Sequence, residues 1–377
     1  MKKRVLLICI MLLNVLSAAQ IPHSKHVGII VLENVSASEV YGNPVMPFFN
    51  SLVWRYASVA KYTTCCHGSL SNYFRLTAGR GITADQYVSS VSNDNIFRHL
   101  LNARKTFKSY EESIPYVGDV IDVIVWPYLK RHDPEAYFSD IFNSSMQQQT
   151  IVPFSQFASD LAAGTLPEYF FITPNAINDV HSCPTSDPCT LNDRLARADK
   201  WLAANIGPYL QSSTFRAGDL LIITADESDL AESANAFLPA VVMSATVKSG
   251  YRSLNSFNHY STLRTMMEDL WLTPNLGAAS TANNLADLFT TEPRPCVVFS
   301  PPTTIVAATV TADSSCSTGS ISQRAVNWGD GTFQIVSRTT LKLYHSYTVP
   351  GTYTAYLRLR DAALNKFWSS RTKISVE

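Results

Sequence analysis

Four side chains that carry oxygen donors follow two short apolar segments of the chain. Glu33 and Asn34 come directly after one segment, and Asp226 and Glu227 come shortly after another. Carboxylate and amide oxygens are the ligands that hard divalent cations prefer in proteins. If the four side chains converge, they form a site for Mg²⁺, Ca²⁺ or Mn²⁺. The alternative is that each acidic pair only places charge in the first turn of a helix.

A second set of polar residues would add imidazole nitrogens to such a site. Asn175, Asp179 and His181 lie close together in the sequence, and His259 lies in a distant segment. Imidazole ligands would also admit Zn²⁺ or iron. The alternative for His259 is a role in capping a helix.

The segment HGSLSNY, residues 67–73, places a serine among small residues. Ser69 is therefore open to an electrophile, but a serine hydroxyl needs a base or a metal ion to become a nucleophile. A cation held by Glu33 and Asp226 would supply that activation, and the amide of Asn72 would donate to a developing oxyanion. No G-x-S-x-G sequence surrounds the serine, which argues against an α/β-hydrolase. The alternative is that the serine caps the helix that follows it.

Short, continuously apolar segments alternate with helix-like segments over most of the chain. Apolar runs of this kind are typical of strands buried on both faces. Their alternation with helices predicts an α/β fold, a mostly parallel sheet flanked by helices. Ligands bind such sheets at the carboxyl ends of the strands, where the candidate residues lie. The expected strands are Val27–Leu32, Ala57–Tyr62, Tyr169–Ile172, Leu220–Ile223 and Pro239–Met243, and the clearest helices are Asp193–Ala204 and Tyr260–Leu270.

The chain changes character near its C-terminal end. Proline-rich sequence predicts a linker over residues 291–302. Residues 303–377 then alternate in short segments separated by turn residues, without a helix signal. This pattern predicts a small β-sandwich. The predicted domains are therefore 20–290 and 303–377.

Residues 1–19 have the pattern of a secretory signal peptide. Lys2–Arg4 are positive, Val5–Leu13 are apolar, and Ser17–Ala19 offers small residues at a cleavage site. The apolar run is shorter than the roughly 20 residues of a membrane-spanning helix. We therefore expect a secreted or periplasmic protein with no transmembrane segment after the signal is removed.

Export would place the cysteines in an oxidising compartment, where disulfides form. The segment Cys183–Cys189 has a cysteine at each end of a short proline-rich loop, so we expect a disulfide there. Cys296 and Cys316 are the next plausible pair. The neighbours Cys65 and Cys66 have partners that the sequence leaves open.

Composition excludes several classes of protein. The 377 residues are 46% hydrophobic and 16% charged, as in a globular protein, which excludes disordered, collagen-like and coiled-coil chains. Thirty Lys and Arg balance thirty Asp and Glu. Because proteins that bind nucleic acid usually carry a basic excess or a basic stripe, we expect no nucleic-acid partner.

The order of several motifs resembles a known family. LEN, HGSLSNY, VPFSQFASDLAAGTLPEYFFITPN, DVH, AGDLLIITADE and NHYSTLRTMMEDL follow one another within residues 24–275. Together they resemble the bacterial phosphoesterase family of secreted acid phosphatases and phospholipases C, in the alkaline phosphatase superfamily. The resemblance implies a metal-assisted attack by Ser or Thr on phosphorus through a covalent phospho-enzyme.

The resemblance also implies roles for individual residues. The implied metal ligands are Glu33, Asn34, Asp226 and Glu227; the implied catalytic residues are Ser69, Asn72 and His67; and the residues implied to hold a second metal, the phosphate or the leaving group are Asn175, Asp179, His181 and His259. The implied cofactor is a divalent ion (Mg, Ca, Mn or Zn). The implied substrate is a small phosphorylated molecule or a phospholipid.

The motifs depart from the usual family sequences without removing a proposed ligand. Gly68 and Ser71 stand where prolines are common, and Ala225 stands where an aromatic residue is common. Phospholipase C members usually continue the Asp-Glu pair with His-Gly-Gly, whereas Ser228–Leu230 follows here. We therefore expect a phosphomonoesterase, with phospholipase C as the first alternative. A non-catalytic surface or adhesion protein and a sulfatase-type hydrolase are two further alternatives.

The tail resembles a second family. VNWGDGT at residues 326–332 and YHSYTVPGTY at residues 344–353 resemble PKD domains, which are immunoglobulin-like β-sandwiches. In such a fold Trp328 and Tyr353 would fill the core. The expected role is a spacer, with contact to a cell surface or a carbohydrate as the alternative.

Overall fold

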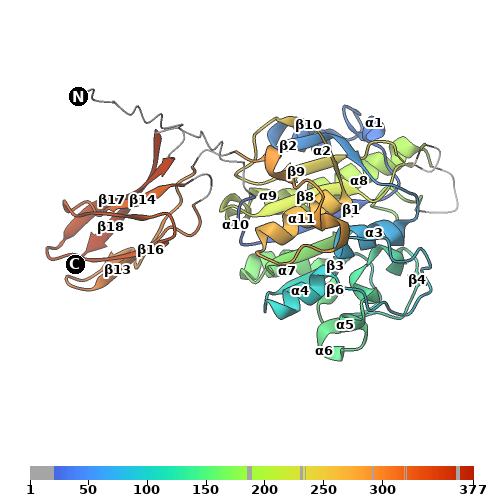
Figure 1. Ribbon diagram of the computed structural model, residues 1–377, viewed down its shortest axis with the longest axis horizontal. Coiled ribbons are helices and arrows are strands. Elements are labelled where there is room, and N and C mark those ends of the chain that lie inside the picture. Colours follow the sequence, from blue (N-terminus) through green and yellow to red (C-terminus); the bar gives the residue numbers. More distant parts are fainter. Residues whose placement is uncertain are drawn as a thin grey trace, which may run out of the picture. The chain divides into compact units, whose positions relative to one another are not determined.

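The computed structural model describes residues 21–184, 189–229, 232–233, 235–290, 293–317, 319, 321–361 and 366–377. The expected signal peptide, residues 1–19, lies outside this part of the chain. The described chain forms two compact units that divide after Thr290, and Figure 1 shows both. Within the described residues, no helix is both long enough and apolar enough to span a bilayer.

The first unit is built on an eight-stranded sheet in the order β10-β2-β9-β8-β1-β7-β3-β6. Only β9 runs antiparallel to both of its neighbours, so the prediction of a mostly parallel sheet is confirmed. The strands are β1 (Val27–Leu32), β2 (Ala57–Thr63), β3 (Phe107–Glu111), β6 (Ile151–Pro153), β7 (Tyr169–Thr173), β8 (Leu220–Ala225), β9 (Ala240–Met243) and β10 (Arg252–Asn258).

Strand β1 lies at the centre of the sheet, between β7 and β8. All six of its residues are buried, as expected for a strand that is covered on both faces. Gly28 leaves room for the ring of Phe170, because a Cβ at this position would lie 2.0 Å from a ring carbon. The parallel register pairs Ile30 with Ile172 and Leu32 with Ala225. The carboxyl ends of β1, β7 and β8 therefore lie side by side.

Helices cover this sheet, and Figure 1 shows them along its length. Helix α3 packs against α11, and α2 packs against α8. A capping box at Thr190 begins α8, and Asn258 caps α11, so both predicted helices start slightly earlier than expected. The helices are α1 (Ala37–Val40), α2 (Pro47–Arg55), α3 (Ser69–Ala78), α4 (Ile96–Asn102), α5 (Ser139–Phe142), α6 (Ser145–Gln148), α7 (Ser155–Ala163), α8 (Leu191–Asn205), α9 (Gly207–Gln211), α10 (Ser213–Arg216) and α11 (His259–Asp269).

Short elements complete the first unit. A two-stranded hairpin, β4 (Ile124–Val125) with β5 (Tyr128–Leu129), precedes a 3₁₀ turn, η1 (Lys130–His132). The further 3₁₀ turns are η2 (Glu135–Tyr137), η3 (Gly277–Ser280) and η4 (Leu285–Leu288).

The second unit is a β-sandwich of two sheets, with strand orders β11-β13-β16 and β12-β18-β17-β14-β15. Both sheets contribute to one hydrophobic core, in which Trp328 is fully buried and Tyr353 is partly buried. The strands are β11 (Val298–Ser300), β12 (Thr303–Thr304), β13 (Thr309–Asp313), β14 (Gln323–Asn327), β15 (Phe333–Ser337), β16 (Lys342–Ser346), β17 (Gly351–Asp361) and β18 (Lys366–Val376).

The boundary of the second unit differs from the expected linker, residues 291–302. Strand β11 lies inside that segment and pairs with β13. The physical reason is Phe299, which is buried in the core of the sandwich and stacks edge-on against Trp328. The proline content of the segment predicted a linker because it does not indicate that burial of Phe299 stabilises strand β11 in the sheet.

Three disulfides are present in the described chain. The expected Cys183–Cys189 bond is there, and so is Cys296–Cys316. The neighbours Cys65 and Cys66, whose partners the sequence left open, are bonded to each other. This last bond lies in the loop between β2 and α3.

Candidate active site

The candidate site is built where strands β1, β7 and β8 end. Glu33 directly follows β1, and its N–H donates to the carbonyl oxygen of Asp179 at 2.8 Å. Asp226 directly follows β8, and its N–H donates to the carbonyl of Leu32 at 3.0 Å. The N–H of Asn34 donates to Oδ1 of Asp226 at 3.1 Å. Backbone hydrogen bonds therefore hold three acidic segments, distant in sequence, at one edge of the sheet.

Ser69 is the first residue of α3 and points toward this edge. Its hydroxyl donates to Oε2 of Glu33 at 3.1 Å, and the hydroxyl of Tyr73 donates to Oε1 of the same carboxylate at 2.5 Å. The residue that caps α3 is Gly68, which has a φ of +118° and no side-chain cap. The Ser69 hydroxyl is therefore not used to cap the helix but contacts an acidic side chain.

Glu227 and Asn72 lie together beside the start of α3. Oε2 of Glu227 accepts hydrogen bonds from the N–H of Gly68 and from Nδ2 of Asn72, the second at 3.0 Å. Nδ2 of Asn72 also donates to the carbonyl of Cys66 at 2.9 Å, and its Oδ1 accepts from the hydroxyl of Thr64 at 2.6 Å. Asn72 is fully buried. Its amide is thus fixed in place beside the first turn of α3.

His259 is fixed by protein groups on both ring nitrogens. Nε2 lies 2.6 Å from the carbonyl oxygen of Asp226, and Nδ1 lies 3.1 Å from the hydroxyl of Tyr62. Burial lowers the pKa of His259 to about 4, so the ring is neutral at pH 7. Asn258, and not His259, caps α11. The arrangement makes His259 a support for the backbone at Asp226.

A histidine that sequence reasoning missed lies at the centre of the cluster. Nε2 of His132 lies 3.3 Å from Oε2 of Glu33, and Nδ1 lies 3.4 Å from Oδ2 of Asp179. The ring stacks on Tyr73 with centroids 5.6 Å apart. Ligand atoms of Glu33, His132 and His181 all lie within 4.8 Å of one another, a spacing that fits one metal ion.

His181 faces a cation of the protein. The guanidinium of Arg131 lies 3.1 Å from Nε2 of His181, and the N–H of His181 donates to Oδ1 of Asp179 at 2.7 Å. Burial, followed by the charge of Arg131, lowers the pKa of His181 to about 4. Arg131 is therefore a positively charged side chain beside this acidic cluster, and the sequence motifs gave no sign of it.

Buried polar atoms in this cluster fit a bound cation. Among the described residues of this cluster, four buried atoms have no hydrogen-bond partner: Oδ1 of Asn34, Nε2 of His132, Oδ2 of Asp179 and Oδ2 of Asp226. Buried groups of this kind are destabilising unless something binds them. A divalent cation is the partner that carboxylate, amide and imidazole ligands have in common. The residues present therefore fit the metal ion that the sequence implied.

The electrostatics lead to the same conclusion. Burial, followed by the charge of Glu227, raises the pKa of Asp226 to about 8. Burial and the neighbouring carboxylates Asp226 and Asp179 raise the pKa of Glu33 well above its usual range. Burial also holds the pKa of His132 well below its usual value. Several buried acidic groups next to a neutral imidazole are stabilised by a cation.

Two predicted residues lie away from these contacts. Oδ1 of Asn175 accepts from the N–H groups of Ile177 and Asn178, and its Nδ2 donates to Ser113. It therefore shapes the turn that leads to Asp179. His67 lies 3.4 Å from the carbonyl of Glu232 and precedes the glycine that caps α3.

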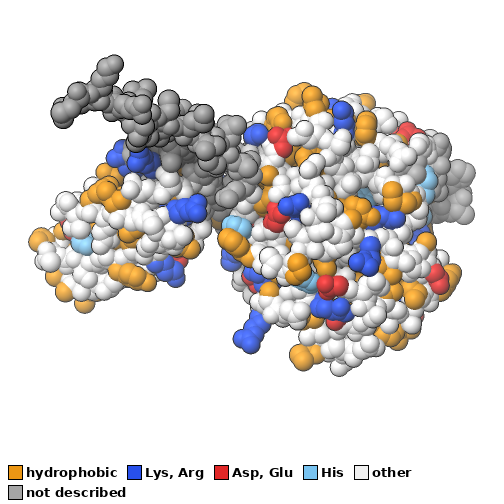
Figure 2. All heavy atoms as spheres, viewed as in Figure 1, with side chains coloured by type: hydrophobic (Ala, Val, Ile, Leu, Met, Phe, Trp, Pro, Cys, Tyr) orange, Lys and Arg blue, Asp and Glu red, His pale blue; other side chains and the backbone are white. Residues whose placement is uncertain are grey.

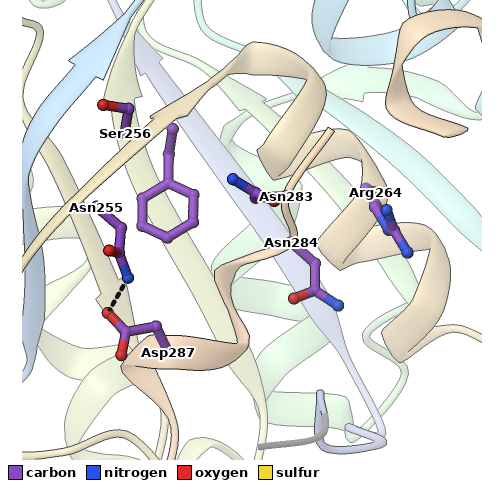
Figure 3. Close-up of a pocket in the computed structure, with 7 residues that line it drawn as sticks. Asn255, Ser256, Arg264, Asn283, Asn284 and Asp287 are labelled. Atoms are coloured by element: carbon purple, nitrogen blue, oxygen red, sulfur yellow. Dashed lines mark hydrogen bonds between the residues drawn. The ribbon is translucent and has the colours of Figure 1, made fainter. Parts of the chain in front are cut away.

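A polar pocket of about 470 Å³ lies elsewhere on the first unit and shares no residue with this cluster. Figure 3 shows Asn255 and Asp287 on one side of it, joined by a hydrogen bond of 3.0 Å. Arg264, on another side, donates to the carbonyl of Ala282 at 2.6 Å. These three side chains thus pair within the protein.

A mostly parallel sheet with acidic side chains gathered at its strand ends is the arrangement expected of a phosphoesterase. The model of the Phosphoesterase family matches residues 33–272, and the chain belongs to that family. The chain is accordingly a hydrolase of phosphoric ester bonds. The sequence-based recognition of this family is confirmed.

Curated relatives carry phosphatase names. The chain is 31% identical to a phosphatidylinositol-3-phosphatase of Mycobacterium tuberculosis, over 73% of this chain and 86% of the relative. It is 25% identical to a probable acid phosphatase of Kluyveromyces lactis, over 67% of this chain and 59% of the relative. The match to an acid phosphatase of Penicillium chrysogenum covers 55% of that protein. The chain thus spans little more than half the length of these fungal relatives.

Solved structures share the fold of the first unit. A protein of the alkaline phosphatase superfamily from Vibrio parahaemolyticus matches with a TM-score of 0.51 and 11% identity, over 93% of this chain and 83% of that one. The lipoteichoic acid synthase LtaP from Listeria monocytogenes matches with a TM-score of 0.51 and 11% identity, over 74% of this chain and 78% of that one. At this identity the likeness concerns the fold alone.

Proposed function

We propose that the protein is a metal-dependent phosphomonoesterase that acts through a phosphoserine at Ser69. The observation that supports this most directly is the 3.1 Å hydrogen bond from the Ser69 hydroxyl to Glu33, inside a cluster of buried acidic and imidazole groups. In this proposal Ser69 is the nucleophile, the acidic and imidazole side chains hold the cation, and Arg131 lies beside them.

Two groups of residues would hold metal ions. Glu33, Asn34, Asp226 and Glu227 supply oxygen ligands, and Asp179, His132 and His181 could complete a second position beside Glu33. A bound divalent cation would lower the pKa of the serine hydroxyl and polarise the phosphoryl group.

The remaining chemistry belongs to the chain itself. Ser69 Oγ attacks the phosphorus of a monoester, the bond from phosphorus to the ester oxygen breaks, and the alcohol leaves with a proton. Water then attacks the phosphoserine, which releases inorganic phosphate and restores the hydroxyl. Glu33 orients Oγ, and Tyr73 holds Glu33. The guanidinium of Arg131 and the N–H groups that begin α3 favour the charge of the phosphoryl oxygens.

Two kinds of phosphate monoester are candidate substrates. Small phosphate monoesters fit the names of the fungal relatives, and a lipid-borne monoester fits the name of the mycobacterial one. Phospholipase C activity is the alternative reaction. Three disulfides among the described residues support the proposal that the protein is secreted or periplasmic. For the second unit we propose a spacer role, with contact to a cell surface or carbohydrate as the alternative.

The direct test is hydrolysis of p-nitrophenyl phosphate by the full chain, with metal content measured by elemental analysis. We expect hydrolysis, and a transient phosphoryl group on the peptide that contains Ser69 after acid quenching. Phosphatidylcholine serves as the substrate that would report phospholipase C activity. If the metal-loaded protein hydrolyses neither p-nitrophenyl phosphate nor phosphatidylcholine, the proposal is wrong.

A further inference from the structure

One segment of the first unit exposes an unusual concentration of apolar side chains. Six of the twelve exposed large hydrophobic residues described in this unit lie between residues 116 and 126. They are Tyr116, Val117, Ile121, Ile124, Val125 and Trp126, exposed by 50%, 40%, 69%, 50%, 39% and 51% respectively. Single exposed apolar residues are ordinary on a protein surface, but clustered ones mark a binding surface. We call this segment, residues 116–126, the apolar hairpin.

The apolar hairpin is held in place rather than loosely attached. Strand β4 pairs with β5, and the N–H groups of Ile121 and Asp122 both donate to Oδ1 of Asp119 at 3.0 Å. Nζ of Lys130 donates to the carbonyl of Val120 at 2.5 Å, and the Val120 side chain is buried. One side of the segment is therefore anchored in the core, so that the apolar side chains on the other side stay in water.

The charge of the apolar hairpin restricts its partner. Residues 113–129 contain no Lys or Arg, and their acidic residues are Asp119 and Asp122. Asp119 is fully buried. Such a surface has no basic group with which to attract nucleic acid or anionic lipid from a distance. It can bind only by burying apolar area, and Trp and Tyr are the residues that favour the boundary between lipid and water.

The apolar hairpin also borders the candidate active site. Its chain continues through Pro127 and β5 into η1, which carries Arg131 and His132. The carbonyl of Pro127 accepts a hydrogen bond of 3.1 Å from the N–H of Ala176, in the loop that leads to Asp179. Figure 1 shows β4 and α3 on the same side of the unit. A surface that docks there would lie next to the acidic cluster of the candidate site.

We propose that the apolar hairpin is a contact surface for a phospholipid bilayer, and that it brings phosphate monoesters carried by lipid headgroups to Ser69. The inference rests on the proposed function for the second half of this statement only. Ile121 and Trp126 insert among the lipids, and the neighbouring 3₁₀ turn η1 lies at the level of the headgroups. On the face that Figure 2 shows, Lys, Arg, Asp and Glu are interspersed, without a continuous basic surface.

The first experiment measures binding of the full chain to vesicles of pure phosphatidylcholine. Because this binding depends on buried apolar area, the double variant Ile121→Ser with Trp126→Ser, called the hairpin variant, lowers vesicle affinity by at least about tenfold. The matched control is Trp54→Ser with Leu254→Ser, which removes two side chains that are 79% and 71% exposed elsewhere on the unit. Wild type and control are expected to bind equally, with little dependence on salt.

The second experiment separates this inference from the proposed function. Phosphatidic acid in phosphatidylcholine vesicles and p-nitrophenyl phosphate are compared as substrates. The hairpin variant is expected to lose at least about tenfold of kcat/KM on the vesicles and to keep the wild-type rate on p-nitrophenyl phosphate. If the wild-type protein binds vesicles but hydrolyses neither substrate, the phosphatase proposal is wrong, and the proposal that the apolar hairpin contacts the bilayer still stands.

Three results would overturn the contact surface. Equal vesicle binding by wild type and hairpin variant is the first. Binding that requires anionic lipid and disappears in salt is the second, because it would assign the contact to basic residues. Dimerisation of the wild type that the hairpin variant abolishes is the third, since a second copy of the chain would then cover the surface.

Discussion

Nε2 of His132 lies 3.3 Å from Oε2 of Glu33, and both side chains are almost completely buried. Burial pushes their pKa values in opposite directions, up for the carboxyl of Glu33 and well down for His132. Both shifts disfavour the charged forms, so burial opposes an ion pair between these two side chains. Two lone-pair donors that face the same point are instead the arrangement expected around a metal ion.

Replacement of His132 tests that interpretation. We expect His132→Ala to lower metal content and to reduce kcat/KM by about 10–100-fold, the usual effect of losing a group that binds or orients at a metal centre. His99→Ala is the matched control, because His99 lies on α4 and pairs with Asp94, not with a residue of the cluster. Unchanged metal content by elemental analysis in His132→Ala would assign His132 a packing role only.

Ser69 is the second target. Without its hydroxyl no phosphoserine can form, so Ser69→Ala should lower kcat by at least about 10³-fold and abolish the acid-stable phosphoryl group. Ser71→Ala, two residues later in α3, removes a hydroxyl whose contact is with Arg75. The control should keep most of its activity. A phosphorylated peptide recovered from Ser69→Ala would place the nucleophile elsewhere.

Metal removal should affect stability as well as activity. A cation that binds only the folded chain adds to its stability by mass action, and its removal leaves Glu33, Asp179 and Asp226 buried together. We expect chelation to abolish hydrolysis and to lower Tm by several degrees, and added divalent ion to restore both. Thermal unfolding with and without chelator is also measured for Asp226→Asn, whose Tm should change less when the chelator is added. Equal responses of the two proteins would show that the ion binds elsewhere.

Continuous apolar runs predicted the central strands because β1, β7 and β8 are buried on both faces. The edge strand β10 gave no such signal, since its residues are mostly exposed. The same logic placed Glu33 and Asp226 correctly at strand ends, where parallel register brings them together. Such reasoning works where one element is enough to position a side chain.

It did not find His132, Arg131 or Tyr73. His132 lies in a 3₁₀ turn after a two-residue strand, and its only local signal is a following aspartate. Its position depends on the hairpin before it and on long-range packing against Tyr73. Asn175 shows the converse case, because it ends a strand as the other candidates do but hydrogen-bonds to its own turn. The positions of such side chains depend on contacts between distant segments, and the spacing of residues in the sequence does not reveal those contacts.

The loop that contains the disulfide between Cys65 and Cys66 contacts the amide of Asn72. The carbonyl of Cys66 accepts a hydrogen bond from Nδ2 of Asn72, and the guanidinium of Arg75 donates to Sγ of Cys66 at 3.2 Å. In the double variant Cys65→Ser with Cys66→Ser, the loop that carries this carbonyl loses its cross-link. We expect KM for p-nitrophenyl phosphate to rise by about 3–10-fold with a smaller change in kcat, which is the signature of weaker substrate binding.

The control for this change is the disulfide of the second unit, in the double variant Cys296→Ser with Cys316→Ser. That bond lies outside the first unit, so its loss should leave both kinetic constants unchanged. A fall in kcat alone for the first double variant would instead indicate that the loop acts on the chemical step.

The last prediction concerns Asp269, at the end of α11. Burial raises its pKa to about 7, against 3.8 for an ordinary aspartate, although the N–H and hydroxyl of Ser24 both donate to it. The folded chain therefore holds a proton that the unfolded chain releases, so the free energy of unfolding falls as pH rises from about 4 to about 7. At about 1.4 kcal/mol per pH unit, this residue alone removes about 3 kcal/mol between pH 5 and pH 8.

Asp269→Asn should remove that loss, because the amide stays neutral, its oxygen still accepts from the N–H of Ser24 and its NH₂ donates to the Ser24 hydroxyl. Urea unfolding at pH 5 and pH 8 measures the difference. The control is Glu268→Gln, one residue earlier, which removes one negative charge from a partly exposed side chain paired with Arg264. Equal pH dependence in wild type and Asp269→Asn would mean that Asp269 is already ionised in the folded protein at pH 5, in spite of its burial.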